Sequence, residues 1–405
     1  MSWKNIELAK VCDVFADGDW IESKDQSDIG IRLIQTGNVG FGRFKARDSK
    51  ARYISEETFK RLRCTEIKEG DLLVSRLPDP VGRACIIPQL VDKSITAVDC
   101  TIIRTKQEIL YSNYLNYYCQ SPQYFEQVKK NITGATRQRI SRSLLGKTLI
   151  PLAPIATQQK IVAKLDAIFA EIDTATAAAE TNAKNAEALF KTYLSDIFQS
   201  ENPNFISKPI GEIGEIFSGA GFPVNQQGLL NEDIPFYKVS DMNLVGNEKY
   251  MISHNNSISR ETAKQLGAKI IPTKSIIFPK IGGAIATNKK RILSIPSCVD
   301  NNVMAIYPND KLVNPDFFFH LFSSIELSSF ANEAALPSIK KSTVEERLVK
   351  IPNSLREQER ICELINTLKD ISYKLKDDYL VKLKSLTLLK QSILKQAFNG
   401  ELVKE

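Results

Sequence analysis

Several short fragments of the chain resemble catalytic motifs, but each lacks a residue that its chemistry requires. Gly146-Lys147-Thr148 resembles the end of a phosphate-binding loop, yet that loop needs a glycine five residues earlier, where Ser141 stands. Asn202-Pro203-Asn204-Phe205 and Asn314-Pro315-Asp316-Phe317 resemble the catalytic tetrapeptide of adenine methyltransferases, whose third residue is normally proline. Without that proline, and without a glycine-rich cofactor loop, both fragments are more typical of turns or helix starts.

Metal-assisted and nucleophilic chemistry also lack the residues they need. Pro78-Asp79 could open a nuclease-type metal site, but no Asp/Glu-x-Lys follows at a useful distance. The chain has two histidines, His254 and His320, and no cysteine cluster to support them, so neither a zinc site nor a histidine-activated nucleophile is predicted. We therefore expect a chain that is not an enzyme and that binds no cofactor or metal.

Cysteine usage and hydropathy indicate the compartment. The seven cysteines are odd in number, scattered and never paired as CxxC, which is typical of reduced thiols in a cytoplasm. No apolar run approaches the roughly 20 residues that span a bilayer, and Met1-Ser2-Trp3-Lys4 does not open a signal-peptide core. We expect a cytoplasmic protein with no membrane partner.

The features that could bind a ligand are more coherent than the catalytic ones. Residues 133–147 are crowded with cations, and the corresponding place in the second half of the chain, after Leu336-Pro337-Ser338, carries two lysines. These cations are Arg137, Arg139, Arg142, Lys147, Lys340 and Lys341. A basic loop that recurs, in a chain of net charge +7, predicts contact with the phosphates of a nucleic acid. The alternative is a solvated loop with no partner.

Two single cations stand at equivalent strand ends. Arg76 and Lys280 lie 204 residues apart, each directly after an apolar run and close to Gly82 or to Gly282-Gly283. A cation at a strand end beside glycine can reach a DNA groove without obstruction by the backbone. The alternative is a surface cation that caps a strand.

Polar side chains in turn-like segments after apolar runs complete the candidate DNA-binding set. Their chemical types are those that read base edges, although polar loop residues are commonplace. In the first half they are Gln35, Thr36 and Asn38, and in the second half they are Lys238, Ser240, Asp241 and Asn243.

The recurrence of these features follows from an internal duplication. Residues 54–62 and 258–266 share six identities in nine positions at an offset of 204. Val98-Asp99 returns as Val299-Asp300, and Gln158 with Ile161 returns as Gln358 with Ile361. The period is too long for a solenoid or a propeller, so each copy should be a complete folding unit.

Each half of the chain combines a mixed, strand-rich region with a long helix. We expect domains at residues 1–150 and 201–350, and long helices within residues 151–200 and 351–405. Short apolar runs bounded by Gly, Pro and Asp predict strands at residues 72–74, 84–87, 101–103, 276–278 and 303–306. Helices are predicted at residues 55–63 and 114–130 and from Pro315 onward, with Ser55 and Ser259 as N-caps.

The two long helices carry apolar residues at alternating steps of three and four, the spacing of a coiled-coil seam. In the first the seam is Leu165, Ile168, Ile172, Ala175, Ala179, Ala186, Leu189 and Tyr193, with a polar slot at Asn182. In the second it is Ile361, Leu364, Leu368, Ile371, Leu375, Tyr379, Leu386, Leu389 and Ile393, interrupted by Lys382. We expect the helices to pack antiparallel on each other, with Asn202-Pro203-Asn204 as the linker. The alternative is two amphipathic helices that each pack on their own domain.

Several segments together resemble the specificity subunit of a type I restriction-modification system. They are the run Ile150 to Val162 (IPLAPIATQQKIV), its partner Ile351 to Ile361, the terminal Leu388 to Leu402 (LLKQSILKQAFNGEL) with a degenerate central counterpart at Leu189-Phe190-Lys191, and Gly70 to Arg76 (GDLLVSR). The likeness covers nearly the whole chain. The second copy departs from the pattern, with Pro279-Lys280-Ile281 where the first has Ser75-Arg76-Leu77.

The resemblance implies an α+β protein with two tandem mixed α/β target-recognition domains, each followed by a long helix. In that family each domain reads half of a gapped site on double-stranded DNA, and the helices space the domains and dock two modification (methyltransferase) subunits. Restriction subunits complete the set of partners. The chain itself would be non-catalytic. The alternatives are a structural scaffold that binds two copies of a protein partner, and an enzyme whose site has no recognised motif.

Overall fold

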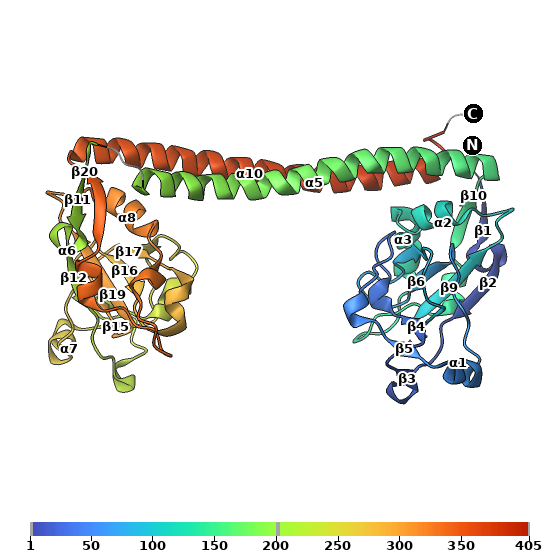
Figure 1. Ribbon diagram of the computed structural model, residues 1–405, viewed down its shortest axis with the longest axis horizontal. Coiled ribbons are helices and arrows are strands. Elements are labelled where there is room, and N and C mark those ends of the chain that lie inside the picture. The colour runs from blue at the N-terminus through green and yellow to red at the C-terminus, as the bar shows by residue number, and fades with distance from the viewer. Residues whose placement is uncertain (1–2, 200–202, 404–405) are drawn as a thin grey trace. The chain divides into compact units, whose positions relative to one another are not determined.

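The computed structural model describes residues 3–199 and 203–403, without the side chain of Gln199. The chain forms two compact units, Met1–Thr181 with Tyr379–Glu405, and Asn182–Asp378. Each unit therefore holds one mixed α/β domain, whose strands and helices are labelled in Figure 1, and a part of each long helix. Asn202, part of the predicted linker, lies outside the described residues.

The first unit contains two four-stranded sheets and one strand pair. The strand orders are β2-β9-β6-β7, β3-β5-β4-β8 and β1-β10, and of these pairs β4–β8 is parallel. The strands are β1 Lys4–Glu7, β2 Cys12–Asp17, β3 Gln26–Ser27, β4 Ile31–Ile34, β5 Tyr53–Ile54, β6 Leu72–Ser75, β7 Ala84–Ile86, β8 Ser94–Thr96, β9 Cys100–Thr105 and β10 Leu149–Leu152. The strands predicted at residues 72–74, 84–87 and 101–103 are confirmed as β6, β7 and β9.

The second unit repeats this topology. Its sheets have the orders β12-β19-β16-β17-β14, β15-β13-β18 and β11-β20, so β12-β19-β16-β17 matches β2-β9-β6-β7. The strands are β11 Phe205–Pro209, β12 Gly214–Ser218, β13 Ile234–Tyr237, β14 Tyr250–Met251, β15 Ser257–Ile258, β16 Ile276–Pro279, β17 Arg291–Leu293, β18 Cys298–Val299, β19 Val303–Pro308 and β20 Leu348–Pro352. The predicted duplication is confirmed at the level of strand order, and the strands expected at residues 276–278 and 303–306 are β16 and β19.

Short helices cover these sheets, and their caps follow the sequence. Ser55 accepts from the Thr58 amide at 3.1 Å, and Ser259 accepts from the Thr262 amide at 3.1 Å, so both predicted N-caps are confirmed. Asn314 caps the helix that opens at Pro315. The short helices are α1 Glu56–Leu62, α2 Ser112–Tyr118, α3 Pro122–Lys130, α4 Arg142–Gly146, α6 Ile210–Ile213, α7 Arg260–Gln265, α8 Pro315–Ser323 and α9 Lys341–Glu345.

The single helix predicted for residues 114–130 is wrong, because the structure has two helices, α2 and α3, in this segment. Pro122 has no amide proton to continue α2, and its ring disfavours helical backbone at the residue before it. Ser121 instead caps α3 by accepting from the Tyr124 amide at 3.2 Å. The break lets the aromatic residues of both helices face one core.

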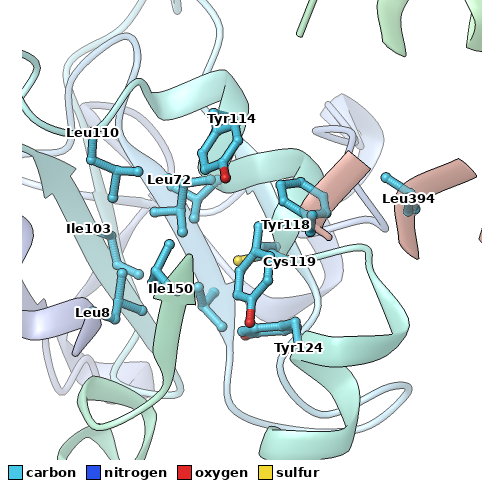
Figure 2. Packing of buried hydrophobic residues seen from close by; sticks show 14 of the residues in the cluster. Leu8, Leu72, Ile103, Leu110, Tyr114, Tyr118, Cys119, Tyr124, Ile150 and Leu394 are labelled. Carbon is cyan, nitrogen blue, oxygen red and sulfur yellow. The ribbon is translucent and has the colours of Figure 1, made fainter. Parts of the chain in front are cut away.

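The core of the first unit lies between the β2-β9-β6-β7 sheet, the α2–α3 pair and the end of the second long helix. Figure 2 shows Leu72 and Ile103 from the sheet near Tyr114, Tyr118 and Leu394 from the helices. The Phe398 ring meets the Tyr118 ring edge-on at 5.0 Å between centroids. The C-terminal end of the chain is therefore a structural part of the N-terminal domain.

The core of the second unit is built in the same way. Phe317, Phe318 and Phe322 of α8 are buried against Ile276 and Phe278 of β16. Phe198, near the end of the first long helix, meets the Phe317 ring at 5.5 Å. Burying aromatic side chains of this size contributes roughly 1.5–3 kcal/mol each, so helix and domain stabilise each other in both units.

The long helices are α5 Ile155–Gln199 and α10 Leu355–Phe398, and they run antiparallel within each unit. In the first unit Lys164 reaches the Leu402 carbonyl at 2.9 Å, while Asp173 pairs with Lys390. In the second unit Glu187 pairs with Lys376 at 2.9 Å, and the Ser372 hydroxyl donates to the Ala186 carbonyl at 2.6 Å. The predicted antiparallel packing is confirmed. No helix of residues 3–199 and 203–403 is long and apolar enough to cross a membrane.

The predicted seam is only partly right. Leu165, Ile172, Ala179 and Ala186 of α5 are buried as expected, as is Ile361 of α10. Several large apolar residues placed in the seam are instead exposed: Leu189, Leu364, Ile371, Leu375 and Leu389. Asn182 is exposed as well, and Ala183 takes the buried position beside it. The contact face also contains polar residues, such as the buried Ser372. Apolar character alone therefore did not identify this face.

Candidate nucleic-acid interface

Each long helix is joined to its domain by one buried glutamine. The Gln158 amide nitrogen donates to the carbonyls of Ile109 and Ala153 at 2.9 and 2.8 Å, and its oxygen accepts from the Tyr111 amide at 2.9 Å. Both glutamines are fully buried. The junction in the first unit is therefore hydrogen-bonded on three sides.

Gln358 makes the same three bonds in the second unit. Its nitrogen donates to the carbonyls of Leu312 and Pro352 at 3.1 and 3.0 Å, and its oxygen accepts from the Asn314 amide at 2.7 Å. A buried amide whose donors and acceptor are satisfied fixes the backbone segments around it. We call these two arrangements the glutamine clasps. They anchor each domain to the helix that follows it.

Arg76 and Lys280 occupy equivalent places beside the basic loops. The Arg76 carbonyl accepts from the Ile140 amide at 3.2 Å, and the Lys280 carbonyl accepts from the Ile339 amide at 2.9 Å. Their own backbone amides donate to the Asp99 and Asn302 carbonyls, both at 2.9 Å. In each unit, the strand-end cation is thus bonded to the basic loop of that unit by an equivalent backbone hydrogen bond.

The side chain of Arg76 is held inside its domain. Its guanidinium donates to the Val98 carbonyl at 2.6 Å and to the Ile140 carbonyl at 3.4 Å, and it lies 3.4 Å from Asp17. Only 13% of this side chain is exposed. Lys280 is partly exposed and makes no ion pair among residues 3–199 and 203–403. Base reading by either residue stays a prediction.

The predicted basic loops are short hairpins in both units. Thr133 and Arg139 pair through backbone bonds of 2.8 and 2.9 Å, and Ala331 forms a bridge with Ile339 in the second loop. Arg137 lies 3.3 Å from Asp99, and Arg142, at the start of α4, lies 3.9 Å from Asp17. The first loop therefore places two of its three arginines beside carboxylates.

The remaining loop cations are less engaged. Arg139 and Lys147 are exposed, and Lys340 is the N-cap residue of α9. Lys341 pairs with Glu345 at 3.4 Å on the same helix. Phosphate contact by these cations also stays a prediction.

The polar turns after β4 and β13 are equivalent 3-10 helices, Thr36–Asn38 and Val239–Asn243. The Asn38 carboxamide oxygen accepts from the Gln35 amide at 3.0 Å, and Asp241 accepts from the Lys238 amide at 2.7 Å. Ser240 and Asn243 are exposed, and Asn243 contacts Lys289. The turns thus share their capping geometry.

In each unit, an arginine at the start of a strand donates hydrogen bonds to backbone carbonyls of the turn. Arg83 donates to the Thr36 and Val39 carbonyls, both at 2.8 Å, and Arg291 donates to the Met242 carbonyl at 3.2 Å. Burial lowers the pKa of both guanidinium groups. These two arginines were not identified from the sequence, although each directly opens or precedes a strand that the chain repeats.

An open hollow of about 360 Å³ lies beside the first turn. Its lining residues are Gln35, Asn38, Arg47, Lys50, Ala51 and Arg52. Arg47, Lys50 and Arg52 were not among the binding residues predicted from the sequence. The available signal was the density of positive charge, since residues 43–52 hold five cations and one acid, Asp48.

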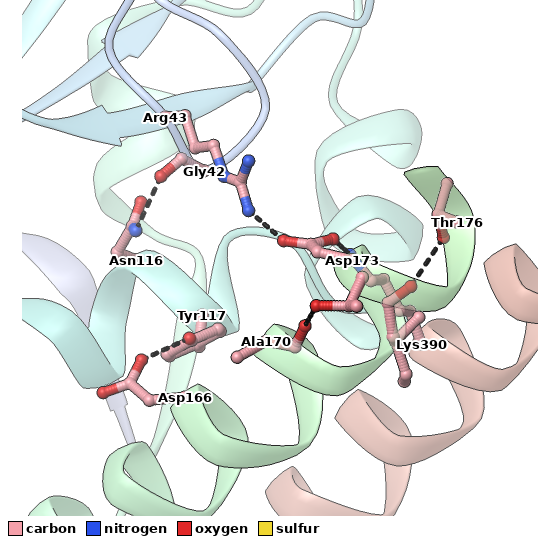
Figure 3. A network of polar contacts seen from close by, with 11 residues as sticks. Gly42, Arg43, Asn116, Tyr117, Asp166, Ala170, Asp173, Thr176 and Lys390 are labelled. Carbon is pink, nitrogen blue, oxygen red and sulfur yellow. Dashed lines mark hydrogen bonds and ion pairs between the residues drawn. The ribbon is translucent and has the colours of Figure 1, made fainter. Parts of the chain in front are cut away.

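A polar network joins the first domain to the long helices within the first unit. Figure 3 shows Arg43 reaching Asp173 of α5, which also contacts Lys390 of α10. Tyr117 donates to Asp166 at 2.5 Å, and Asn116 donates to the Gly42 carbonyl at 3.0 Å. The Lys390 ammonium is the main cause of a lowered pKa at Asp173.

Cys85, Cys100 and His320 are buried. Burial raises the pKa of the Cys85 thiol to about 12 and that of Cys100 to about 11, and burial lowers the pKa of His320 to about 4. Among the residues that the structure describes, no group of three or more His, Cys, Asp or Glu side chains could hold a metal ion.

Comparisons with known proteins identify the family. The model of the type I restriction modification DNA specificity domain matches residues 1–181 and 203–384. The type I restriction enzyme EcoBI specificity subunit of Escherichia coli is 24% identical over 352 residues, which cover 78% of this chain and 70% of that protein.

Two solved structures share the fold. One is a structure that describes complex assembly and conformational transition of the type I R-M system. It has a TM-score of 0.75 at 18% sequence identity, and the match covers 99% of this chain and 98% of that chain. The other, the HsdS subunit from Thermoanaerobacter tengcongensis, has a TM-score of 0.64 at 18% identity over 99% and 97%.

Proposed function

The chain belongs to the type I restriction modification DNA specificity family, and on this premise we propose that it reads a gapped, bipartite DNA site for partner subunits. Each mixed domain would read one half-site on double-stranded DNA. Two methyltransferase subunits, and restriction subunits where present, would be directed to that site. The chain itself would carry out no chemistry.

The observation that carries this proposal is the equivalence of the two candidate interfaces. Arg76 and Lys280 each bond to the residue directly before the neighbouring strand, β9 or β19, and to an isoleucine at the end of the basic loop. The turns beginning at Gln35 and Lys238 have the same capping bonds. Two binding surfaces of one design with different side chains suit a target with two similar but non-identical halves. The repeated domains at residues 1–150 and 201–350 would be the two readers.

The exposed apolar residues of the long helices support docking of protein partners. Leu364, Ile371 and Leu375 are 38%, 56% and 39% exposed, and their spacing of seven and four residues places them on one face of α10. Apolar side chains that remain in water on a packed helix are typical of a surface that a partner covers. A scaffold that binds only protein would use the same surface, but it gives no reason for the repeated polar and basic loops.

Methylation mapping of host DNA with and without the gene tests this function. We expect a gapped, non-palindromic methylated motif that is present only when this chain and its methyltransferase partner are present. Unchanged methylation with a competent partner would contradict the proposal. Methyl transfer from labelled S-adenosylmethionine to DNA by the purified chain alone would contradict its non-catalytic part.

We further propose that the length of the long helices sets the spacer between the half-sites. Half-sites of dimeric DNA readers commonly lie about 34–36 Å apart. Inserting four residues after Ala179 should therefore change the spacer and leave both half-site sequences unaltered. Altered half-sites with an unchanged spacer would contradict this.

A further inference from the structure

Three of the four arginines that the sequence singles out in the first domain lie beside carboxylates, whereas Arg139 is exposed and makes no ion pair among residues 3–199 and 203–403. Arg76 and Arg142 share Asp17, at 3.4 and 3.9 Å, and Arg137 lies 3.3 Å from Asp99. A cation must loosen such a pair before it can bind another anion. The first domain should therefore have its principal phosphate contact where cations converge without carboxylates.

Arg47, Lys50 and Arg52 meet that condition. All three are exposed and line the 360 Å³ hollow beside Gln35 and Asn38. Across residues 3–199 and 203–403, none of them forms an ion pair, and the hollow has no carboxylate among its lining residues. Their charges remain available to a ligand.

The one acid of this loop is withdrawn from the hollow. Arg32, on strand β4, pairs with Asp48 at 2.7 Å and donates to the Ala46 carbonyl at 2.5 Å. The Arg32 side chain is only 14% exposed, so it is a framework group and not a surface cation. This pairing leaves Arg47, Lys50 and Arg52 uncompensated.

The loop that carries the cations is held in place by hydrogen bonds. The Asn38 side-chain nitrogen donates to the carbonyls of Lys45 and Ala46 at 2.8 and 3.0 Å. The Leu33 amide donates to the Arg52 carbonyl at 2.8 Å, which ties the other end of the loop to β4. A fixed loop loses less entropy on binding than a mobile one.

Gly37 makes room for the Arg47 guanidinium. A Cβ atom at residue 37 would lie 1.8 Å from Nη1 of Arg47. Arg47 itself adopts a left-handed backbone conformation with φ of 52°, which is uncommon for a residue with a side chain. The turn and the loop are therefore fitted to each other at the hollow.

We propose that this hollow binds a phosphate group of the DNA backbone next to the half-site of the first domain. The assignment rests on the proposed function. Three cations without a carboxylate match an oxyanion, and the Asn38 carboxamide is already bonded within the loop. The corresponding segment of the second domain, residues 244–256, carries Glu248 and Lys249 instead, so the contact belongs to one half-site.

The test compares two triple variants of the full chain, each assembled with its methyltransferase subunits. One carries R47A, K50A and R52A, and the control carries K4A, K60A and K68A, which removes the same charge from exposed sites of the same domain. The probes are a duplex with the motif found by methylation mapping and a scrambled duplex. Affinity is measured across a range of salt concentrations.

We expect the slope of log affinity against log salt to fall by about 0.9 for the first triple, since the hollow binds one phosphate and each neutralised phosphate contributes about 0.9. The fall should be the same on both duplexes, and the control should keep the slope of the unmodified protein. Equal slopes in the two triples would overturn the proposal. A changed base preference in the first half-site would also overturn it, because phosphate contacts carry no sequence information.

A variant that keeps the charge provides a second test. G37A should displace the Arg47 guanidinium and lower the slope by part of the roughly 0.9 expected for the triple, because Arg47 is one of three cations around the same phosphate. The control is G221A, where an added Cβ meets nothing within 4 Å. An unchanged slope in G37A would remove Arg47 from the site. If the unmodified complex does not distinguish the two duplexes, the proposed function fails; if it does and the variants match their controls, this inference fails alone.

Discussion

The two units attach their long helices in the same way, whereas the loops that follow their polar turns differ in charge. The glutamine clasps of Gln158 and Gln358 make the same three bonds. The first loop is held by the Arg32–Asp48 pair and exposes three cations. The second is held by Asn247, which donates to the carbonyls of Asp241 and Ser253 at 2.8 and 2.7 Å.

This difference separates two kinds of constraint on a duplicated domain. Replacing a buried amide side chain that bonds three backbone groups lowers the stability of the fold, because each group left unpaired costs about 1–3 kcal/mol. An exposed loop can exchange an ion pair for an amide, provided that its own backbone stays bonded. The units can therefore diverge in the surface they present while they keep the junction to the helix.

The largest effect should come from removing a glutamine clasp. Gln158→Ala and Gln358→Ala should each destabilise their own unit by roughly 3 kcal/mol, since three buried partners lose a bond worth about 1 kcal/mol each. Denaturant unfolding, monitored by hydrogen exchange in each unit separately, measures this loss of stability. The exposed neighbours provide controls, Gln159→Ala and Glu359→Ala, which should change little. A large cost in one unit only would show that the clasps are not equivalent.

Arg76 and Lys280 should respond differently to truncation despite their equivalent positions. If they read bases, Arg76→Ala should relax the first half-site and Lys280→Ala the second, by on the order of 1–3 kcal/mol of discrimination. Arg76→Ala should in addition lower stability, because the Val98 and Ile140 carbonyls lose a donor. Binding to single-base variants of both half-sites separates the two effects. An unchanged preference profile for Arg76→Ala would leave it a framework residue only.

Mild acid should weaken the second unit more than the first. Burial lowers the pKa of His320 from 6.5 to about 4, so the unfolded chain takes up this proton first and stability falls as pH drops below 6.5. The loss between pH 6.5 and pH 5.5 should be about 1 kcal/mol. Hydrogen exchange in α8 at the two pH values measures it. Equal pH dependence in His320→Gln and the unmodified protein would contradict this assignment.

The smallest effect should come from the network that Figure 3 shows. Asp173→Asn should lower the stability of the first unit by about 0.5 kcal/mol, because exposed ion pairs are weak and screened by salt. The lowered pKa of Asp173 means that its contribution is present above its usual value of 3.8 and is lost as pH falls below it. Thermal unfolding at low and high salt measures the difference. A loss that persists at high salt would indicate packing instead of charge.

The sequence by itself determined the duplication, the caps Ser55 and Ser259, and the strands β6, β7, β9, β16 and β19. Caps and strands could be predicted because each depends on residues close together in the chain. Ser55 and Ser259 cap helices through amides three residues ahead. Apolar runs between Gly, Pro and Asp likewise become strands wherever they bury their faces. Pro122 was a local signal too, and it ended a helix that periodicity alone had extended.

Only the tertiary structure decided which side chains are available to a ligand. Arg76 and Arg47 look alike in the sequence, but Asp17 and two carbonyls occupy Arg76, whereas Arg32 removes Asp48 from Arg47. The seam of the long helices was also decided by packing, since Ser372 is buried while Ile371 beside it is exposed. Availability and burial depend on groups brought together from distant parts of the chain, and spacing along the sequence does not contain that information.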